Sequence, residues 1–182
     1  DKNKTFSYKD LFENIWASKK KLELEYGISK GDTVILAANK NVAFVFIYFA
    51  LHFIGAKVMP IDELISQDRL KFIFDKISPK LIIGLENKIN TIKFIGFDCF
   101  IDLETSIIPL DVSFPNLEDD ADLLFTTGTT GEPKGVILSH KNIAQSANNI
   151  NSFIGNNHHD IELLAMPVSH SFGLARLKGV LS

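Results

Sequence analysis

The chain has 182 residues, 46% of them hydrophobic and 23% charged, which is typical of a globular domain. Its formal net charge of -3 gives no reason to expect nucleic acid or an anionic membrane surface as a partner. The single cysteine, Cys99, excludes an internal disulfide and fits a reducing compartment. The polar first residues lack the apolar run of a signal peptide, so we expect a cytoplasmic protein.

The first half of the chain alternates between helical and strand patterns. Ser7 with Asp10 resembles a capping box that begins a helix, and Gly27 is expected to end it. Thr33–Ala38 is a short apolar run, which predicts a strand buried on both faces. The most apolar stretch, Val42–Ala56, falls short of the roughly 20 residues that span a membrane. We therefore predict a buried helix there and no transmembrane segment.

The next elements continue this alternation and indicate the fold class. Lys57–Ile61 is a strand candidate, Ser66–Ile77 a helix, and Leu81–Gly84 a third strand. This order predicts an α/β fold in which a largely parallel sheet is flanked by helices on both faces. Thr91–Ile95 and Cys99–Leu103 are candidates for further short strands.

The second half begins with the polar, acidic segment 111–122, which we interpret as a linker between two sub-regions. We therefore divide the chain into an N-terminal α/β lobe, 1–110, and the start of a second lobe, 111–182. We predict strands at Ala121–Phe125, Val136–Leu138 and Ile161–Met166, and helices from Ser139 to about Phe153 and from Phe172 onward.

Between two of these strands lies the segment Thr126–Gly135, which reads TTGTTGEPKG. Glycine allows backbone N–H groups to approach a ligand closely, and successive N–H groups form an anion-binding concavity. The threonine hydroxyls add donors, and Lys134 adds a compact positive charge suited to phosphate oxygens. No Gly-Lys pair falls at the Walker A offset. The loop thus predicts a polyphosphate site of another kind, and a flexible hairpin turn is the plain alternative.

Leu124–His140 resembles the phosphate-loop signature of the adenylate-forming (AMP-binding) superfamily of acyl- and aryl-CoA synthetases, luciferases and peptide-synthetase adenylation domains. Met166–Leu174 (MPVSHSFGL) is similar to the His-bearing motif of the CoA synthetases and luciferases, and Val34–Asp62 is similar to the family's N-terminal lobe. The resemblance is strongest to acyl-CoA synthetases. It implies the incomplete N-terminal part of the adenylate-forming fold and, among functions, fatty acid metabolism.

The resemblance also implies a reaction and its site. ATP and a carboxylic acid would give an acyl-adenylate and pyrophosphate, after which the thiol of coenzyme A or of a carrier protein would take the acyl group. Mg²⁺ would bridge the phosphates. His170 would sit where the acid meets the α-phosphate. The residues implied around the β- and γ-phosphates are Thr126, Thr127, Gly128, Thr129, Thr130, Gly131 and Lys134. The family's later motifs and C-terminal domain are missing from this sequence, so we expect a fragment that does not form acyl-adenylate alone.

Plainer interpretations stay open for several of these residues. His170 could be an ordinary histidine beside a turn, and the whole chain could be a non-catalytic nucleotide-binding or scaffold module. The clusters His158–Asp160 and Glu118–Asp122 could bind a cation, but solvated surface explains them more simply. Cys99, among aromatic neighbours, is expected to be a small core residue rather than a nucleophile.

Overall fold

The described residues of the computed structural model, which are 4–39, 41–85, 92–104, 108–109, 111–126 and 133–181, form one sheet of six strands. The spatial order is β4-β3-β1-β2-β5-β6. All neighbouring pairs are parallel except β5 and β6, which are antiparallel. The strands are β1 (Thr33–Ala38), β2 (Lys57–Asp62), β3 (Leu81–Ile83), β4 (Phe94–Ile95), β5 (Asp120–Thr126) and β6 (Lys134–Ser139). This confirms the predicted α/β class with a largely parallel sheet.

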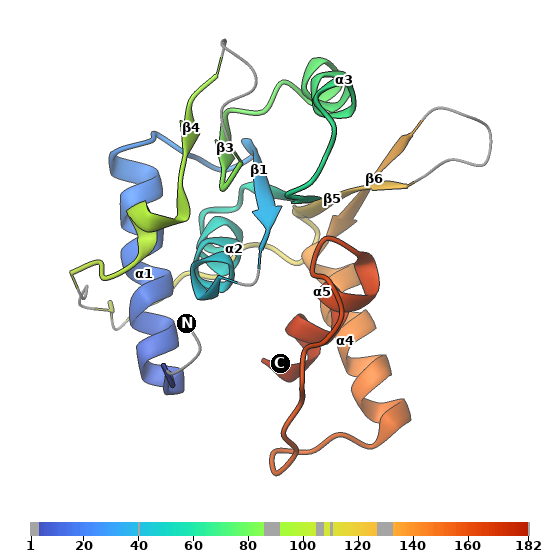
Figure 1. The fold of residues 1–182 in the computed structure, drawn as a ribbon. Helices are drawn as coiled ribbons and strands as arrows, with labels where there is room; N and C mark the ends of the chain where they lie inside the picture. The colour runs from blue at the N-terminus through green and yellow to red at the C-terminus, as the bar shows by residue number, and fades with distance from the viewer. Residues whose placement is uncertain are drawn as a thin grey trace.

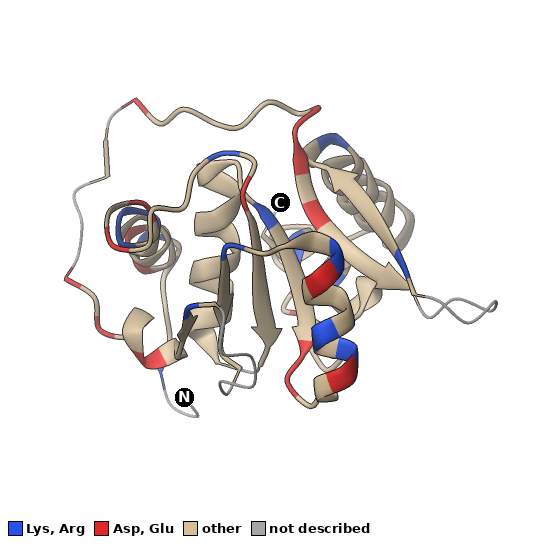
Figure 2. Ribbon diagram, turned by 90° about the horizontal axis from the view of Figure 1, so that it is seen from above, with Lys and Arg blue, Asp and Glu red and all other residues tan. Residues whose placement is uncertain are grey.

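Helices lie on both faces of this sheet (Figure 2). They are α1 (Tyr8–Leu24), α2 (Val42–Ile54), α3 (Gln67–Ile77), α4 (His140–Ile154) and α5 (Ser171–Val180), labelled in Figure 1. Successive side chains of a strand point to opposite faces, so β1 contributes to two cores. Val34 and Leu36 join the core that contains α2 and part of α5, whereas Ile35 joins the core beneath α3.

The helix ends follow from local side-chain chemistry. The Ser7 hydroxyl accepts a hydrogen bond from the Asp10 amide at 3.1 Å, and the Asp10 carboxylate accepts one from the Ser7 amide at 2.8 Å. This confirms the predicted capping box. Ser139 begins α4 in the same way with Asn142 as its partner. Gly55 ends α2 with a φ of 80°, a left-handed conformation that glycine adopts without steric cost. None of the described helices is long and apolar enough to cross a membrane.

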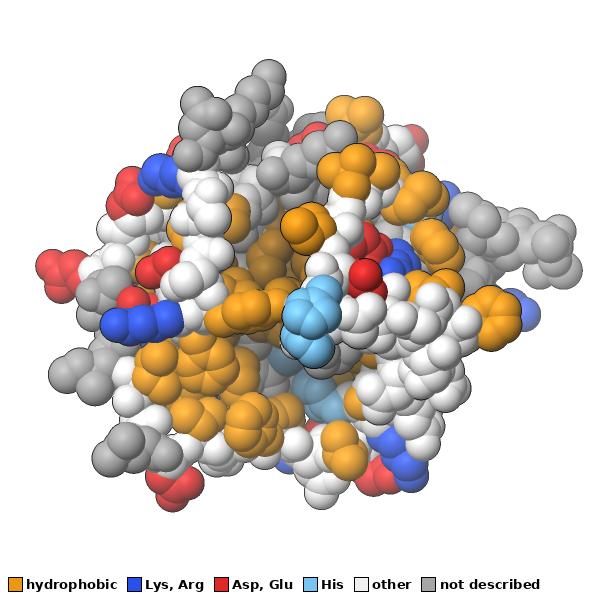
Figure 3. Space-filling model, turned by 90° about the horizontal axis from the view of Figure 1, so that it is seen from below, with side chains coloured by type: hydrophobic (Ala, Val, Ile, Leu, Met, Phe, Trp, Pro, Cys, Tyr) orange, Lys and Arg blue, Asp and Glu red, His pale blue; other side chains and the backbone are white. Residues whose placement is uncertain are grey.

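Two strand predictions were wrong. Residues 161–166 form no strand, and Ile161 and Leu163 are 100% and 87% exposed. Apolar content alone cannot form a strand, because a strand needs a neighbour that satisfies its backbone groups. Figure 3 shows one face of the molecule on which hydrophobic side chains gather.

The segment around Cys99 also differs from the prediction, because Phe97–Phe100 forms a 3₁₀ helix rather than the start of a strand. Phe97 and Phe100 lie three residues apart, which places them on the same side of such a helix, and both are buried. Cys99 is exposed instead of being a core residue. Spacing within the turn, rather than aromatic neighbours, decides which side chain is inside.

The predicted acidic linker is shorter than expected. Asp120 already belongs to β5, and the Asp122 side chain is completely buried. A carboxylate can lie inside only with charged or hydrogen-bonding partners, which here come from α2 and α5. The remaining acidic residues do lie at the surface, where Glu118 pairs with Lys141 and Asp119 with Lys30.

Candidate active site

Strands β5 and β6, which flank the phosphate-loop motif in the sequence, pair as an antiparallel hairpin (Figure 1). Thr126, the last residue of β5, pairs with Lys134, the first residue of β6. The Thr126 hydroxyl donates to the Lys134 carbonyl at 3.4 Å, and both residues are exposed. Two exposed residues, one with a hydroxyl and one with an ammonium group, therefore pair at the base of the loop. The other predicted loop residues, Thr127, Gly128, Thr129, Thr130 and Gly131, lie outside the described residues.

The glycine after Lys134 has a packing reason. A Cβ added at Gly135 would lie 3.2 Å from a methyl carbon of Leu123 and 3.4 Å from the ring of Phe125. These two side chains belong to the facing strand β5, and they cover the backbone of β6 next to Lys134. The small residue lets the hairpin close tightly just before its loop.

His170 occupies the N-cap position of α5, and its own side chain makes no capping hydrogen bond. Its backbone amide donates to the Pro167 carbonyl at 3.2 Å, which closes a turn onto the helix. The first helical turn rests on this carbonyl so closely that a Cβ at Gly173 would lie 2.2 Å from the Pro167 oxygen. The imidazole is exposed, and no described residue forms a hydrogen bond with its ring. His170 is thus held by its backbone while its ring stays available.

A hollow of about 660 Å³ lies beside the His motif. Its lining includes Ala38 and Asp62, the last residues of β1 and β2, and also the stretch 164–169 that leads to His170. Asn39 in its wall donates from its side-chain amide to the Glu63 carboxylate at 2.8 Å. In parallel α/β folds, ligands bind at the carboxyl ends of the strands, and the volume suits a small molecule. The hollow and the loop base both lie at this edge, because β5 runs parallel to β2 and ends at the loop.

A buried charge cluster, which sequence reasoning missed, lies at the opposite end of β5. The Asp122 carboxylate accepts hydrogen bonds from the Tyr48 hydroxyl at 2.8 and 2.9 Å and from the Lys178 ammonium at 3.0 Å, and it lies 3.0 Å from His52 Nε2. Burial alone would raise the pKa of Asp122. The hydrogen bond and charge of His52, together with the charge of Lys178, outweigh burial and lower this pKa to about 2. The signal in the sequence was an aspartate inside an apolar strand run.

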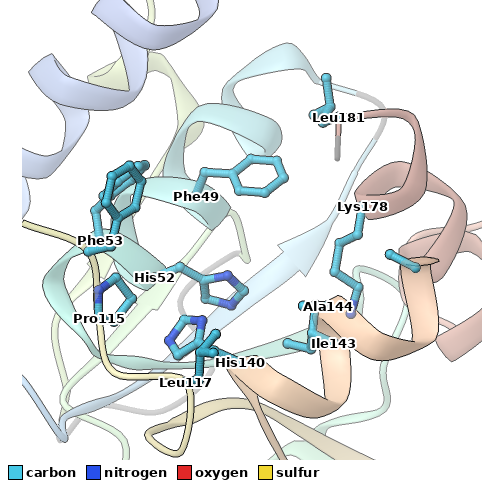
Figure 4. Close-up of a pocket in the computed structure, with 12 residues that line it drawn as sticks. Phe49, His52, Phe53, Pro115, Leu117, His140, Ile143, Ala144, Lys178 and Leu181 are labelled. Atoms are coloured by element: carbon cyan, nitrogen blue, oxygen red, sulfur yellow. The ribbon is translucent and has the colours of Figure 1, made fainter. Parts of the chain in front are cut away.

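A second, mostly apolar hollow of about 310 Å³ lies next to this cluster (Figure 4). His140 and His52 line it with their rings 5.1 Å apart, and Lys178 extends toward it from α5. Burial and the charge of His52 lower the pKa of His140 to about 4. His140 follows Ser139, which pairs with Asp120, so this hollow lies at the opposite end of the hairpin from the phosphate loop.

The described residues do not support a cation site at His158–Asp160 or at Glu118–Asp122. The rings of His158 and His159 are exposed and 3.9 Å apart, and the Asp160 carboxylate accepts hydrogen bonds from Asn157 within the same turn. Within the part of the chain that the structure describes, no group of three or more His, Cys, Asp or Glu residues is placed to hold a metal ion.

Comparison with known proteins identifies relatives of the whole chain. The family model described as AMP-binding enzyme matches residues 1–182. The 2-succinylbenzoate–CoA ligase of Geobacillus kaustophilus (strain HTA426) is 28% identical over 180 residues, which cover 96% of this chain and 36% of that protein. A plipastatin synthase component of Bacillus subtilis (strain 168) is 27% identical over 178 residues, covering 96% of this chain and 7% of that protein.

Solved structures agree with the fold. The O-succinylbenzoate coenzyme A synthetase of Bacillus subtilis in complex with AMP superposes with a TM-score of 0.85 at 23% identity, over 97% of this chain and 47% of that one. The structure of McyG A-PCP, complexed with phenylalanyl-adenylate, gives a TM-score of 0.81 at 26% identity over 98% of this chain and 30% of that one. The chain therefore spans less than half the length of these relatives.

Proposed function

Because the chain belongs to the AMP-binding enzyme family, we propose that it supplies the phosphate-binding part of an ATP-dependent ligase that activates a carboxylic acid. In this reaction a carboxylate oxygen attacks the α-phosphorus of ATP. The bond from that phosphorus to the bridging oxygen of the β-phosphate breaks, which gives an acyl-adenylate and pyrophosphate. A thiol then attacks the acyl carbon and releases AMP. The division of the chain into the lobes 1–110 and 111–182 is also part of this proposal.

The observation that carries the proposal is the pairing of Thr126 with Lys134 at the base of the hairpin loop. Pyrophosphate gains negative charge as it leaves, and donors fixed in advance around it stabilise that charge. The exposed Lys134, paired with the exposed Thr126, can offer an ammonium group to a polyphosphate chain, and Lys134 would hold the β- or γ-phosphate. By family resemblance, the proposal assigns the remaining phosphate contacts to the loop residues Thr127, Gly128, Thr129, Thr130 and Gly131.

His170 is proposed as the residue that orients the acid against the α-phosphate. Its ring is exposed, and the stretch leading to it lines the hollow at the carboxyl edge of the sheet. A ring nitrogen can donate a hydrogen bond to a carboxylate or phosphate oxygen while the backbone stays fixed by Pro167. Positioning of this kind lowers the entropy cost of bringing two anions together.

The proposal includes Mg²⁺, which would bind together with the nucleotide. The described residues offer no cluster of three acidic or histidine ligands, so the phosphate oxygens and water would supply most of its coordination. When bound, the ion would neutralise part of the phosphate charge, and Lys134 would contact the β- or γ-phosphate.

For the second step we propose coenzyme A, with a carrier-protein thiol as the competing acceptor. The relatives include both a CoA ligase and a plipastatin synthase component. The His-bearing motif around His170 resembles the CoA synthetase form and favours coenzyme A. The relatives named above do not support the expectation of fatty acid metabolism, and the identity of the acid stays open.

Titration calorimetry with Mg-ATP tests the phosphate grip. Lys134→Ala should weaken binding about tenfold, because it removes a charge-assisted contact worth roughly 1.4 kcal/mol. Lys141→Ala is the matched control, since Lys141 pairs with Glu118 at the surface of α4 and should leave binding unchanged. Equal affinities for wild type and Lys134→Ala would count against the proposal.

The non-catalytic alternative makes a different prediction for longer forms of the protein. Acid-dependent exchange of pyrophosphate into ATP by a form that includes the rest of the fold would support the ligase, and nucleotide binding without exchange would favour a scaffold module. The 182-residue chain alone is expected to show no exchange, because it spans less than half of its relatives. Robust exchange by the isolated chain would show that this expectation is wrong.

A further inference from the structure

The mostly apolar hollow beside the buried charge cluster has the size of a small-molecule site. Its volume of about 310 Å³ lies in the range of pockets that hold organic ligands. Phe49 and Phe53 of α2 contribute aromatic rings to its wall, and Ile143 and Ala144 of α4 contribute aliphatic groups (Figure 4). Ala144 is exposed, so the hollow is open to solvent and a ligand can enter it.

One polar atom in the wall of this hollow lacks a partner. The Nε2 atom of the His140 ring is buried, and no described residue forms a hydrogen bond with it. The ring itself lines the hollow next to the ring of His52 (Figure 4). A buried polar atom without a hydrogen bond has lost its hydration without compensation. A ligand that supplies the missing partner would therefore gain affinity from it.

An organic molecule suits this hollow better than water does. A buried water needs about two to four polar partners. Most of the side chains that line the hollow are apolar, and the other two polar ones, His52 and Lys178, are engaged with Asp122. A molecule with an apolar body and a single polar group matches both the apolar wall and the His140 nitrogen.

A hydroxyl is the polar group that suits His140. Burial and the charge of His52 lower the pKa of His140 to about 4, so its ring is neutral at neutral pH. In a neutral ring Nε2 donates or accepts according to the tautomer, and a hydroxyl can serve as the partner in either case. The charges of Asp122 and Lys178 offset each other at 3.0 Å, so the wall favours a neutral ligand over an ion.

From these observations we propose that this hollow is a binding site for a small neutral apolar molecule with one hydroxyl group, such as a phenol, whose hydroxyl pairs with Nε2 of His140. The site depends on side chains of α2, α4 and α5 and of the segment before β5, and not on the proposed ligase reaction. A ligand held between these elements stabilises the folded chain, because it binds the folded state and not the unfolded one.

Titration of the 182-residue chain with p-cresol and with p-xylene tests the site. The two probes have nearly the same size, and p-xylene carries a methyl group where p-cresol carries its hydroxyl. In nuclear magnetic resonance spectra the Ile143 methyl signals report occupancy, and the Nε2 nitrogen signal of His140 reports the hydrogen bond. We expect p-cresol to shift both signals and p-xylene to shift only the methyl signals. No saturable shift of the Ile143 signals with either probe would overturn the proposal.

A variant that fills the hollow tests the location of the site. Ala144→Phe adds a ring at a lining position and should abolish the binding of both probes. Ser146→Phe is the matched control, because Ser146 is exposed on the same helix and does not line the hollow. It should leave the binding of both probes unchanged. Binding that persists in Ala144→Phe would overturn the proposed location.

A variant of the polar group tests the hydrogen bond. His140→Leu removes the nitrogen and keeps an apolar side chain, so it should weaken p-cresol binding about tenfold relative to p-xylene binding. Equal weakening for the two probes would contradict the hydrogen bond. Circular dichroism shows whether each variant is folded. If His140→Leu does not fold, the wild-type chain still decides, because an unchanged His140 Nε2 signal at saturating p-cresol would overturn the proposal.

Discussion

The hydroxyl of Tyr48 donates to both carboxylate oxygens of Asp122, at 2.8 and 2.9 Å, although the residues lie 74 positions apart. Both side chains are completely buried. Tyr48 belongs to α2 and Asp122 to β5, so the bond joins the first α/β units to the hairpin that carries the phosphate loop. The burial of Tyr48 and the charge of the Asp122 carboxylate raise the pKa of Tyr48 well above its ordinary value, which keeps the phenol a donor.

Removal of this carboxylate should destabilise the fold strongly. Asp122→Ala leaves the Lys178 ammonium buried without its partner, and breaking a buried pair in this way costs about 3–5 kcal/mol. Tyr48→Phe removes one hydrogen-bond donor and should cost about 1–3 kcal/mol. Urea denaturation gives both free energies of unfolding. Equal costs for the two variants would contradict the assigned charge balance.

The Asp122 carboxylate should also make stability depend on pH in the acid range. Its pKa is about 2 in the folded chain and near 3.9 when unfolded, so the unfolded state binds the proton first as the pH falls. The stabilisation is therefore complete above about pH 4 and is lost as the pH falls toward 2; about two pKa units correspond to roughly 2–3 kcal/mol. The difference in unfolding free energy between wild type and Asp122→Asn should shrink over this window. A constant difference would argue against a lowered pKa.

His140 should remain neutral well below the ordinary range of histidine. Burial and the charge of His52 lower its pKa to about 4, so the folded state resists protonation. Its contribution to stability is present above about pH 6.5 and is lost as the pH falls through 4. Titration of the imidazole signals by nuclear magnetic resonance, assigned with a His140→Gln variant, measures the midpoint directly. A midpoint near the ordinary histidine value of about 6.5 would show that the ring is not shielded.

A single methyl group should disturb the His motif. In Gly173→Ala the new Cβ would lie 2.2 Å from the Pro167 carbonyl oxygen, so α5 must move away from the turn that holds His170. We expect a loss of about 1–3 kcal/mol in unfolding free energy, as for other overpacked sites. Gly179→Ala, on the same helix, meets only the Asn151 side chain at 3.2 Å and should be tolerated far better. Similar melting temperatures for the two variants would contradict the close approach.

The elements that local signals specify were predictable from the sequence. The strand Thr33–Ala38 was predicted with its observed bounds, and the capping box at Ser7 and the two strands flanking the phosphate loop are confirmed. Residues 161–166 were predicted wrongly because an apolar run does not reveal whether a neighbouring strand exists. Asp122 was taken for linker surface because its partners Tyr48 and Lys178 are distant in sequence. Only tertiary structure brings such groups together.

For the candidate site, too, the features set by short motifs were predictable and those set by tertiary structure were not. The sequence predicted the loop chemistry and pointed to His170, because both depend on short motifs. It could not show that Thr126 and Lys134 pair across the hairpin base, or that a hollow of about 660 Å³ adjoins the His motif. Their roles in binding and positioning stay predictions.

Calorimetric comparison of Mg-pyrophosphate with AMP tests the phosphate grip of this chain most directly. If the loop flanked by Thr126 and Lys134 holds the β- and γ-phosphates, pyrophosphate should bind more tightly than AMP, and Lys134→Ala should weaken pyrophosphate binding about tenfold while barely changing that of AMP. AMP binding more tightly than pyrophosphate, with no effect of Lys134→Ala on either ligand, would contradict the account.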